Sequence, residues 1–226
     1  MNIYDKVRLS NFTKRGVGLL LKAIVRDYRN EHAYSFGKKN KVQKNGGVLW
    51  RCMKQIHGDG NIIELDRGVI CRRVLFHISG NNNMIKLHDN AYLSGCELWI
   101  EGNNCKIEIG EKVCITHHSH LAVTEDGSEI TIGNNSGCSS YVQMRTGDSH
   151  PIYDSKGNRV NKAGSIHIGE KCWIGQGARI LKRVTLGDNV IVGTGSVVIS
   201  SFDSNVTVMG YPAFPVNFGT VHPNEK

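Results

Sequence analysis

Aliphatic residues recur every six positions near the C-terminal end of the chain, and a small or apolar residue follows each of them four positions later. The aliphatic series is Ile168, Ile174, Ile180, Leu186, Val192 and Val198. This spacing fits neither the helical period of 3.6 residues nor the strand period of two. A period of six predicts a chain that turns a corner every six residues, with the aliphatic side chain inward and glycine or a small residue where bulk or a negative φ would clash. Three hexads close one triangular coil, so the sequence predicts an all-β parallel β-helix.

A looser form of this repeat extends upstream. Pairs of aliphatic residues separated by one residue begin at Ile63, Ile85, Ile107, Ile130, Ile166 and Val184. The steps between them are 22, 22, 23, 36 and 18 residues. Steps of 22 and 23 predict extra corner residues, and the asparagine runs at 81–83 and 103–104 fall at those corners, where asparagine tolerates a positive φ. The step of 36 predicts a protruding loop at 146–165, and solenoids place such insertions on a working face.

The chain has 226 residues with 26 glycines and 4 prolines, which fits one elongated solenoid better than two globular domains. Residues 1–44 lack the repeat, and 17–28 have helical spacing, so we expect an N-terminal cap with a short helix. The solenoid domain would then span 45–213, followed by a tail at 214–226. The helical run is too short to cross a bilayer and no cleavage site follows it, so any membrane contact would be peripheral.

The net charge and the positions of the cysteines restrict the classes of possible binding partner only slightly. The formal net charge of +8 favours anionic ligands, but no nucleic-acid-binding motif is present. The seven cysteines are scattered, with no CxxC pair, and Cys138 and Cys172 fall on inward positions. We therefore expect reduced cysteines that fill the core of a cytoplasmic protein.

The histidines carry the candidate chemistry. His117, His118 and His120 lie one coil before the loop, and His150 lies inside it. A histidine with an ordinary pKa near 6.5 is a suitable general base for a sugar hydroxyl. For His117 and His118 we favour the simpler interpretation of solvent-exposed loop residues, whereas His150 stands out by its context.

That context resembles a known family. The hexads, the loop pair His150-Pro151 and the run Cys172-Trp173-Ile174-Gly175 are similar to those of hexapeptide-repeat acyltransferases. Residues 130–213 resemble the galactoside and maltose O-acetyltransferases and their relatives that O-acetylate capsule sugars such as polysialic acid. The run Gly210-Tyr211-Pro212-Ala213 matches the usual end of the family's solenoid. These motifs are specific for the superfamily and weak for the acceptor.

The resemblance implies a left-handed parallel β-helix and a homotrimer with active sites between subunits. It also implies acetyl-CoA as the donor, no metal, and direct transfer to a sugar hydroxyl of a bacterial surface polysaccharide. His150 would be the general base, and a backbone N–H at a repeat corner would face the oxyanion. Trp173 would lie near the acceptor and the pantetheine end of CoA, with packing in the cleft wall as the alternative.

Further site residues follow from position in the family. Those that match the pantetheine groove are Gln176, Thr194, Gly195 and Ser200. Relatives often carry Thr-Lys where this chain has Ile199-Ser200, and the customary basic run after Pro212 is replaced. The CoA phosphates would then be bound by Arg183 or its basic neighbours Arg179 and Lys182, for which a solvated corner is the alternative.

On the acceptor side, His120 stands where galactoside-type enzymes carry a polar residue, often asparagine. Together with Arg145 and the basic charge balance, it suits an acidic acceptor such as sialic acid. Tyr153, Lys156 and Arg159 on the loop could add contacts to a carboxylate.

Three rival functions remain open at this stage. An N-acetyltransferase of a nucleotide-linked amino sugar would share the fold, the donor and the base. A zinc hydrase related to the γ-class carbonic anhydrases needs a second histidine about five residues after the loop histidine, where this chain has Ser155. A scaffold without activity is disfavoured by the presence of both His150 and Trp173.

Overall fold

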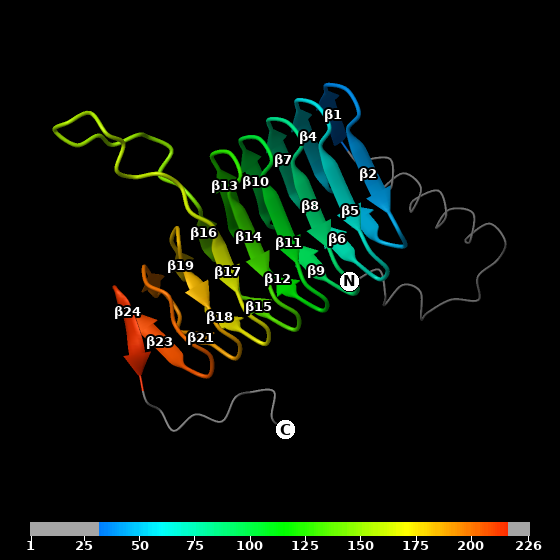
Figure 1. Cartoon of the computed structure of the whole chain (residues 1–226). Coiled ribbons are helices and arrows are strands. Elements are labelled where there is room, and N and C mark those ends of the chain that lie inside the picture. Colours follow the sequence, from blue (N-terminus) through cyan, green and yellow to red (C-terminus); the bar gives the residue numbers. More distant parts are fainter. Residues whose placement is uncertain (1–31, 217–226) are drawn as a thin grey trace, which may run out of the picture.

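The computed structural model describes residues 32–216, and within that range the chain forms 24 strands and no helix. The strands make three sheets, and each coil visits all three in turn, which gives a triangular solenoid (Figure 1). Sheet A consists of β1 (His32–Phe36), β4 (Met53–His57), β7 (Leu75–Ser79), β10 (Glu97–Glu101), β13 (His120–Thr124), β16 (Gln143–Arg145), β19 (Arg179–Ile180) and β22 (Val197–Val198). This part of the chain therefore offers no helix that could span a membrane.

The other two sheets complete the prism. Sheet B consists of β2 (Lys41–Lys44), β5 (Ile62–Leu65), β8 (Met84–Leu87), β11 (Lys106–Ile109), β14 (Glu129–Ile132), β17 (Ile166–Ile168) and β20 (Thr185–Leu186). Sheet C consists of β3 (Val48–Trp50), β6 (Ile70–Arg72), β9 (Tyr92–Ser94), β12 (Cys114–Ile115), β15 (Gly137–Cys138), β18 (Trp173–Ile174), β21 (Ile191–Val192), β23 (Thr207–Gly210) and β24 (Ala213–Val216). All pairings are parallel except the terminal hairpin of β23 and β24.

The register confirms the repeat steps. Ile63 pairs with Ile85, Ile85 with Ile107, Ile107 with Ile130, and Ile130 with Ile166. All five side chains are fully buried, and each such burial contributes roughly 1.5–3 kcal/mol. Because the same inward positions repeat in every coil, one hydrophobic core runs along the axis of the solenoid.

The hexads follow the expected pattern, with one correction about glycine. Ile174 and Ala178 are both buried, so each hexad sends two side chains inward. At Gly175 an added Cβ would lie 2.7 Å from the backbone nitrogen of Thr194 on the next coil, although the φ of Gly175 is ordinary. Positive φ occurs two residues after this position in each hexad, at Lys171, Gly177, Arg183, Asn189 and Gly195. Glycine is therefore needed at Gly175 for close packing between coils, and the left-handed φ occurs two residues later.

Asparagines occupy the corners between sheets A and B, as predicted. Asn82 and Asn104 each have a φ of 56°. Asn83 is buried, and its side chain donates a hydrogen bond to the carbonyl of Gly102 (2.8 Å) and accepts one from the backbone of Cys105 (2.8 Å). These contacts satisfy the polar groups of a buried amide and join neighbouring coils.

The solenoid begins earlier than the predicted boundary at residue 45. β1 and β2 already form a coil, in which Val42 pairs with Ile63 and Lys44 pairs with Leu65. The pattern was hidden because lysine replaces leucine at the open end of the solenoid. The predicted cap helix at 17–28 lies outside the described residues. At the other end, β24 extends the sheet to Val216, past the predicted end of the domain at 213.

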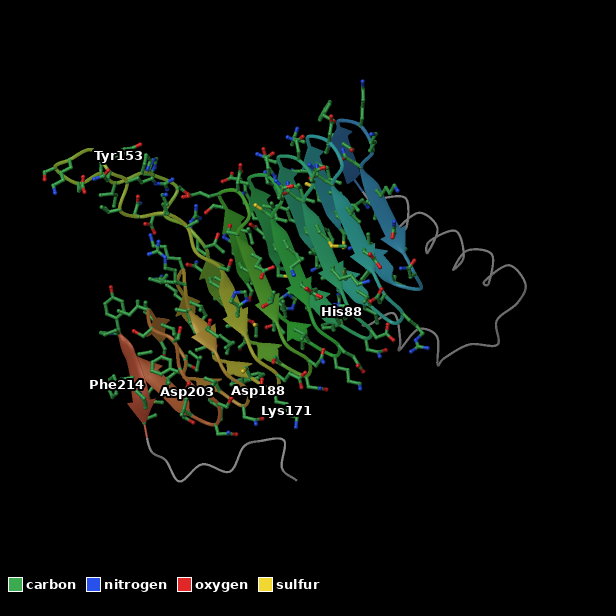
Figure 2. All side chains as sticks on the ribbon, viewed as in Figure 1. His88, Tyr153, Lys171, Asp188, Asp203 and Phe214 are labelled. Carbon is green, nitrogen blue, oxygen red and sulfur yellow. The ribbon has the colours of Figure 1, made fainter. Side chains whose placement is uncertain are left out.

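The predicted insertion is present between β16 and β17, and it projects from the solenoid (Figure 1). Tyr153 lies on its outer part, at the upper left of the view and above the terminal hairpin that carries Phe214 (Figure 2). β14 and β17 still pair directly, so the insertion does not disturb the register of sheet B.

Candidate active site

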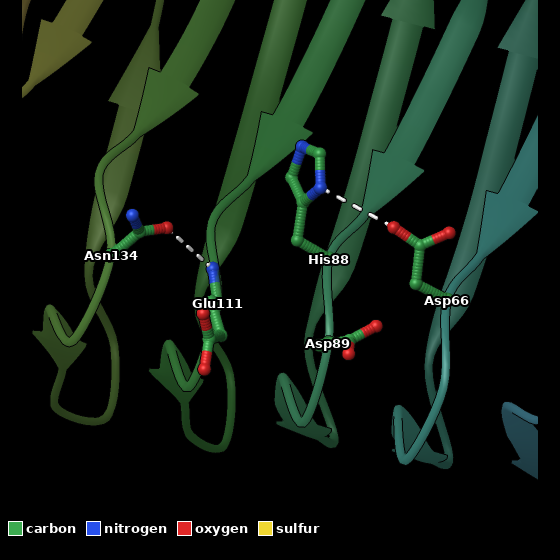
Figure 3. A pocket seen from close by; sticks show the side chains of 5 residues that line it. All are labelled: Asp66, His88, Asp89, Glu111 and Asn134. Carbon is green, nitrogen blue, oxygen red and sulfur yellow. Dashed lines mark hydrogen bonds and ion pairs between the residues drawn. The ribbon is translucent and has the colours of Figure 1, made fainter.

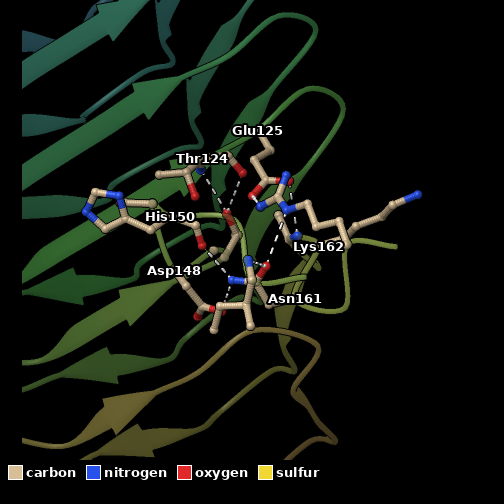
Figure 4. A network of polar contacts seen from close by, with 12 residues as sticks. Thr124, Glu125, Asp148, His150, Asn161 and Lys162 are labelled. Atoms are coloured by element: carbon tan, nitrogen blue, oxygen red, sulfur yellow. Dashed lines mark hydrogen bonds and ion pairs between the residues drawn. The ribbon is translucent and has the colours of Figure 1, made fainter. Parts of the chain in front are cut away.

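The inner part of the loop is held by one buried asparagine. The Asn161 side chain donates to the backbone carbonyl of His150 (2.7 Å) and to Oδ2 of Asp148 (2.9 Å), and it accepts from the backbone of Ile152 (2.6 Å). Asn161 is 7% exposed, so water competes little for these bonds. The amide thereby ties the outgoing arm of the loop to the returning arm on both sides of His150 (Figure 4).

Two ion pairs fasten the same region to the solenoid. Lys182 pairs with Asp148, and Arg159 pairs with Glu125 at the sheet A to sheet B corner. The hydrogen bond from Lys182 holds the pKa of Asp148 below its usual value. Burial alone would raise the pKa of Glu125, but its contacts with Arg159 and the Ala163 backbone, together with the charge of Lys182, outweigh this effect and lower it. The charge of Arg159, expected to face an acceptor, is therefore directed at Glu125.

His150 combines a fixed main chain with an exposed side chain. Its imidazole points away from the polar network that holds its carbonyl (Figure 4). The imidazole can therefore contact a bound molecule without breaking contacts within the protein.

Arg145 supports the approach to His150. Its Nε donates to the carbonyl of Gly147 (2.9 Å), and its guanidinium also contacts the hydroxyl of Ser149. Ser149 has a φ of 65°, so the chain bends immediately before His150. Arg145, expected to bind the acceptor, is thus at least partly engaged in shaping the loop.

His120 lies at the start of β13, one strand from Arg145 in sheet A. Its Nε2 atom is buried without a hydrogen-bond partner among the described residues, and it lies 4.0 Å from a carboxylate oxygen of Glu97. Burial lowers the pKa of His120, Glu97 opposes that shift, and Arg145 adds to it. The lowered pKa favours the neutral imidazole, and its unpaired Nε2 atom is shielded from solvent.

Tyr153 is 60% exposed and lies on the outer part of the loop, where its backbone bridges to Arg159. Lys156 is also exposed, in a turn closed by Asp154. No described contact brings either residue to His120.

Trp173 lies on a different face of the prism from the loop. It is 48% exposed on the outer side of β18, in sheet C. A Cβ added to Gly137 would lie 2.9 Å from two atoms of the indole, so this glycine lets the ring lie across the neighbouring strand. Sequence reasoning missed Gly137, because only the pairing of β15 with β18 makes its role visible.

The residues expected to bind CoA are only partly grouped. Gln176 and Gly195 stack at the corner between sheets C and A, where the Gly195 N–H donates to the Gln176 carbonyl (2.8 Å). Thr194 is exposed beside them, and Ser200 is exposed at the following corner. Arg183 donates to the carbonyl of Lys162 at the base of the loop (2.9 Å), on another side of the solenoid.

The cysteines and the remaining candidate histidines lie outside this loop. Six cysteines are buried and Cys114 is exposed; burial raises the pKa of Cys138 to about 12, which keeps that thiol protonated. His117 and His118 are exposed. Within residues 32–216, no group of three or more His, Cys, Asp or Glu side chains could hold a metal ion.

An open depression lies where sheets B and C meet, lined by Asp66, His88, Asp89, Glu111 and Asn134 (Figure 3). His88 is enclosed by carboxylates, with Nδ1 3.3 Å from Asp66 and Nε2 2.8 Å from Glu108. These groups satisfy one another, and the depression lies at a different corner from His150.

Comparisons with known proteins bear on the family resemblance and the fold. Residues 165–200 match the bacterial transferase hexapeptide family, described by six repeats. The putative colanic acid biosynthesis acetyltransferase WcaF of Escherichia coli K12 is 41% identical over 85 residues, which are 38% of this chain and 45% of that protein. A putative acetyltransferase of Schizosaccharomyces pombe is 34% identical over 92 residues, 40% of this chain and 44% of that protein. The match thus spans less than half the length of each of these relatives.

Among solved structures, the polySia-specific acetyltransferase NeuO superposes with a TM-score of 0.76 at 25% identity, covering 83% of this chain and 86% of that one. The polysialic acid O-acetyltransferase OatWY shares the fold, with a TM-score of 0.68 at 22% identity over 82% of this chain and 88% of that one. These findings confirm the resemblance to hexapeptide-repeat acyltransferases and the left-handed β-helix.

Proposed function

We propose that this protein is an acetyl-CoA-dependent O-acetyltransferase that acts on a sugar hydroxyl of a bacterial surface polysaccharide, with sialic acid as one acceptor to test. The observation that carries the proposal is the exposed imidazole of His150 on a loop whose main chain Asn161 holds in place. The similarity to acetyltransferases over the hexad region supports the transfer chemistry.

In the proposed reaction, His150 accepts the proton of the acceptor hydroxyl as that oxygen attacks the thioester carbonyl of acetyl-CoA. A new C–O bond forms, and the C–S bond breaks when the tetrahedral intermediate collapses. The proton then passes from His150 to the departing CoA sulfur, so the imidazole ends neutral. A backbone N–H directed at the developing oxyanion would stabilise the intermediate.

We further propose a homotrimer with each site between two subunits, acting in the cytoplasm. Within one chain, His150 and Trp173 lie on different faces of the solenoid. A second copy would bring the Trp173 face, with Gln176 and Gly195, opposite the loop of the first. His120, whose side chain is partly exposed, would line the acceptor side of the site.

The test is thiol release from acetyl-CoA with a panel of polysialic acid, free sialic acid, neutral galactosides and amino-sugar nucleotides. We expect release with a sugar hydroxyl acceptor, and a ~10²–10⁴-fold lower rate in His150→Ala. His118→Ala, which removes an exposed imidazole at another corner, is the matched control. A wild-type rate in His150→Ala would exclude this base, and release only with amino-sugar nucleotides would assign N-acetylation.

A further inference from the structure

The charge of the solenoid changes along its axis. The first coil, residues 32–52, contains β1, β2 and β3 and lies at one end of the prism (Figure 1). It carries five lysine and arginine side chains and no aspartate or glutamate. These cations are Lys38, Lys39, Lys41, Lys44 and Arg51. The coil at 120–142 has the opposite composition, with three carboxylates and no lysine or arginine.

The coils between these two form a gradient of charge. Residues 53–74 carry four lysine or arginine residues and three carboxylates, 75–96 carry one of each kind, and 97–119 carry two lysines and four carboxylates. The formal charge therefore falls steadily from the first coil towards the loop that follows β16. Such a separation gives the molecule a preferred orientation near an anionic surface, with the first coil towards it.

Three ammonium groups of the first coil are accessible. Lys38 and Lys39 are exposed at the corner between sheets A and B, and Lys41 is exposed on β2. None of these three forms an ion pair with another residue of 32–216. Asp59 lies at the same corner of the next coil, but its carboxylate accepts a hydrogen bond from the backbone N–H of Lys38 (2.6 Å) and not from an ammonium group. The three charges therefore face outward, where an anionic partner can reach them.

Exposed aromatic side chains accompany these cations. Tyr34 and Phe36 lie on the outward side of β1 and are 53% and 64% exposed, although Phe36 stacks on His57. Aromatic rings and lysine stems enter the boundary between lipid headgroups and acyl chains, while their polar ends stay in water. Rings within a few residues of accessible lysines are therefore typical of a surface that binds anionic lipids.

The chain that leads into this coil has a similar composition. Residues 1–31 contain seven lysine and arginine residues against three carboxylates, and 17–28 have the spacing of an amphipathic helix. This segment lies outside the described residues. Its composition places further positive charge next to the first coil in the sequence.

A soluble polyanion matches this end of the prism less well than a membrane does. An acidic polysaccharide that reached the first coil from the loop would have to pass the coils at 97–142, where carboxylates outnumber lysines and repel it. The sequence contains no nucleic-acid-binding motif. An anionic lipid surface accounts for the cations and the rings together.

We propose that the first coil binds the surface of an anionic membrane through its exposed lysines and its two exposed rings. The acidic coils at 97–142 oppose binding along the side of the solenoid, so the molecule binds by its end. Five strand spacings of about 4.8 Å separate β1 from β16, so the loop lies about 24 Å from the lipid headgroups and stays open to an acceptor. Membrane binding goes beyond the proposed function and does not depend on it.

The experiment is co-sedimentation of the full-length protein with vesicles of phosphatidylcholine alone and of equal parts phosphatidylcholine and phosphatidylglycerol. We expect binding to the anionic vesicles only, and weaker binding as the salt concentration rises. Lys38→Gln/Lys39→Gln should lower the partition coefficient about 25-fold, because each lysine near an anionic surface contributes about fivefold. Lys112→Gln/Lys171→Gln makes the same change of charge at the corner between sheets B and C, and this matched control should bind like the wild type.

A second variant tests the rings. Tyr34→Ser/Phe36→Ser should weaken binding to the anionic vesicles and leave its salt dependence unchanged, because the rings contribute apolar burial and no charge. Circular dichroism verifies that each variant retains its strands.

Several outcomes would overturn the proposal. They are no binding to the anionic vesicles, equal binding to neutral and anionic vesicles, and equal binding by Lys38→Gln/Lys39→Gln and the wild type. An equal loss in the control variant would show an effect of net charge alone, and preference for soluble RNA or polysialic acid over the vesicles would assign the coil to a soluble polyanion. Thiol release with a soluble acceptor should be unchanged in Lys38→Gln/Lys39→Gln, so a failure of the enzyme proposal is distinguished from a failure of membrane binding.

Discussion

Asn161 and His150 are 11 residues apart, and the side-chain amide of the first holds the main chain of the second. A base that is displaced by about 1 Å can lose two orders of magnitude in rate, so the positioning amide matters as much as the basicity of the imidazole. The histidine was visible in the sequence because of its motif. The asparagine was not, because its partners Asp148 and Ile152 are brought to it only by the path of the loop.

We predict that Asn161→Ala lowers kcat by about 10²-fold through loss of loop geometry. The KM for acetyl-CoA should change little, because Asn161 contacts Lys182, a residue expected to bind CoA, through its backbone carbonyl (3.3 Å), which the substitution keeps. Asn158→Ala, in the exposed turn of the same loop, serves as the control and should retain activity. Steady-state kinetics check both variants, and an unimpaired kcat in Asn161→Ala would show that His150 is positioned by other contacts.

The lowered pKa of His120 predicts a pH-dependent stability. Burial holds its folded pKa below the ordinary 6.5, so the unfolded chain binds the proton more readily. This contribution is fully present above pH 6.5 and is lost as the pH falls below that value towards the folded pKa. Urea unfolding between pH 7.5 and 5 should show a fall in stability that is smaller in His120→Gln; an identical fall would assign the pH dependence to other groups.

At the scale of the coil, the stacking of Ile63, Ile85, Ile107 and Ile130 could be predicted because each coil repeats the same inward positions. The first coil could not be predicted from the sequence, since Lys44 takes the place of an inward leucine at the open end of the solenoid. The reason for glycine in the hexads was only half predictable, because sequence alone does not separate a positive φ from close approach between coils.

Substitutions at two glycines of one coil distinguish the effect of a positive φ from the effect of close approach between coils. A methyl group at Gly175 would lie 2.7 Å from backbone atoms of the next coil, whereas Gly177 has a φ of 69° and nothing within 4 Å. We expect Gly175→Ala to destabilise the protein by about 3 kcal/mol through overpacking. Gly177→Ala should cost about 1 kcal/mol through backbone strain alone. Chemical denaturation compares them, and equal losses would contradict the close-approach explanation.

Across the whole molecule, sheet C presents a stripe of exposed apolar side chains. Its members lie in one register column and are Val48, Ile70, Tyr92 and Trp173, with Cys114 and Gly137 between the last two. Exposed patches of this extent usually mark an interface. Trimer assembly would cover the stripe, but neither the hexads nor the face of a single chain specifies the number of subunits.

We predict that Ile70→Glu dissociates the proposed trimer, because a charge would be buried in the contact between copies. The monomers should keep their β-sheet circular dichroism and lose acetyl transfer, since His150 and Trp173 would no longer face each other. Thr131→Glu, on the outward face of sheet B, is the control. Light scattering measures the mass, and an unchanged assembly in Ile70→Glu would place the interface on another face.

The direct pairing of Ile130 with Ile166 has a consequence for how this scaffold can diversify. The two coils meet as if the 146–165 segment were absent, so its length does not set the register of the scaffold, and Asp148 and Arg159 fasten it to the solenoid from outside. Evolution, or a protein engineer, can exchange this segment as a cassette and alter the chemistry at its base while the register of the solenoid stays unchanged.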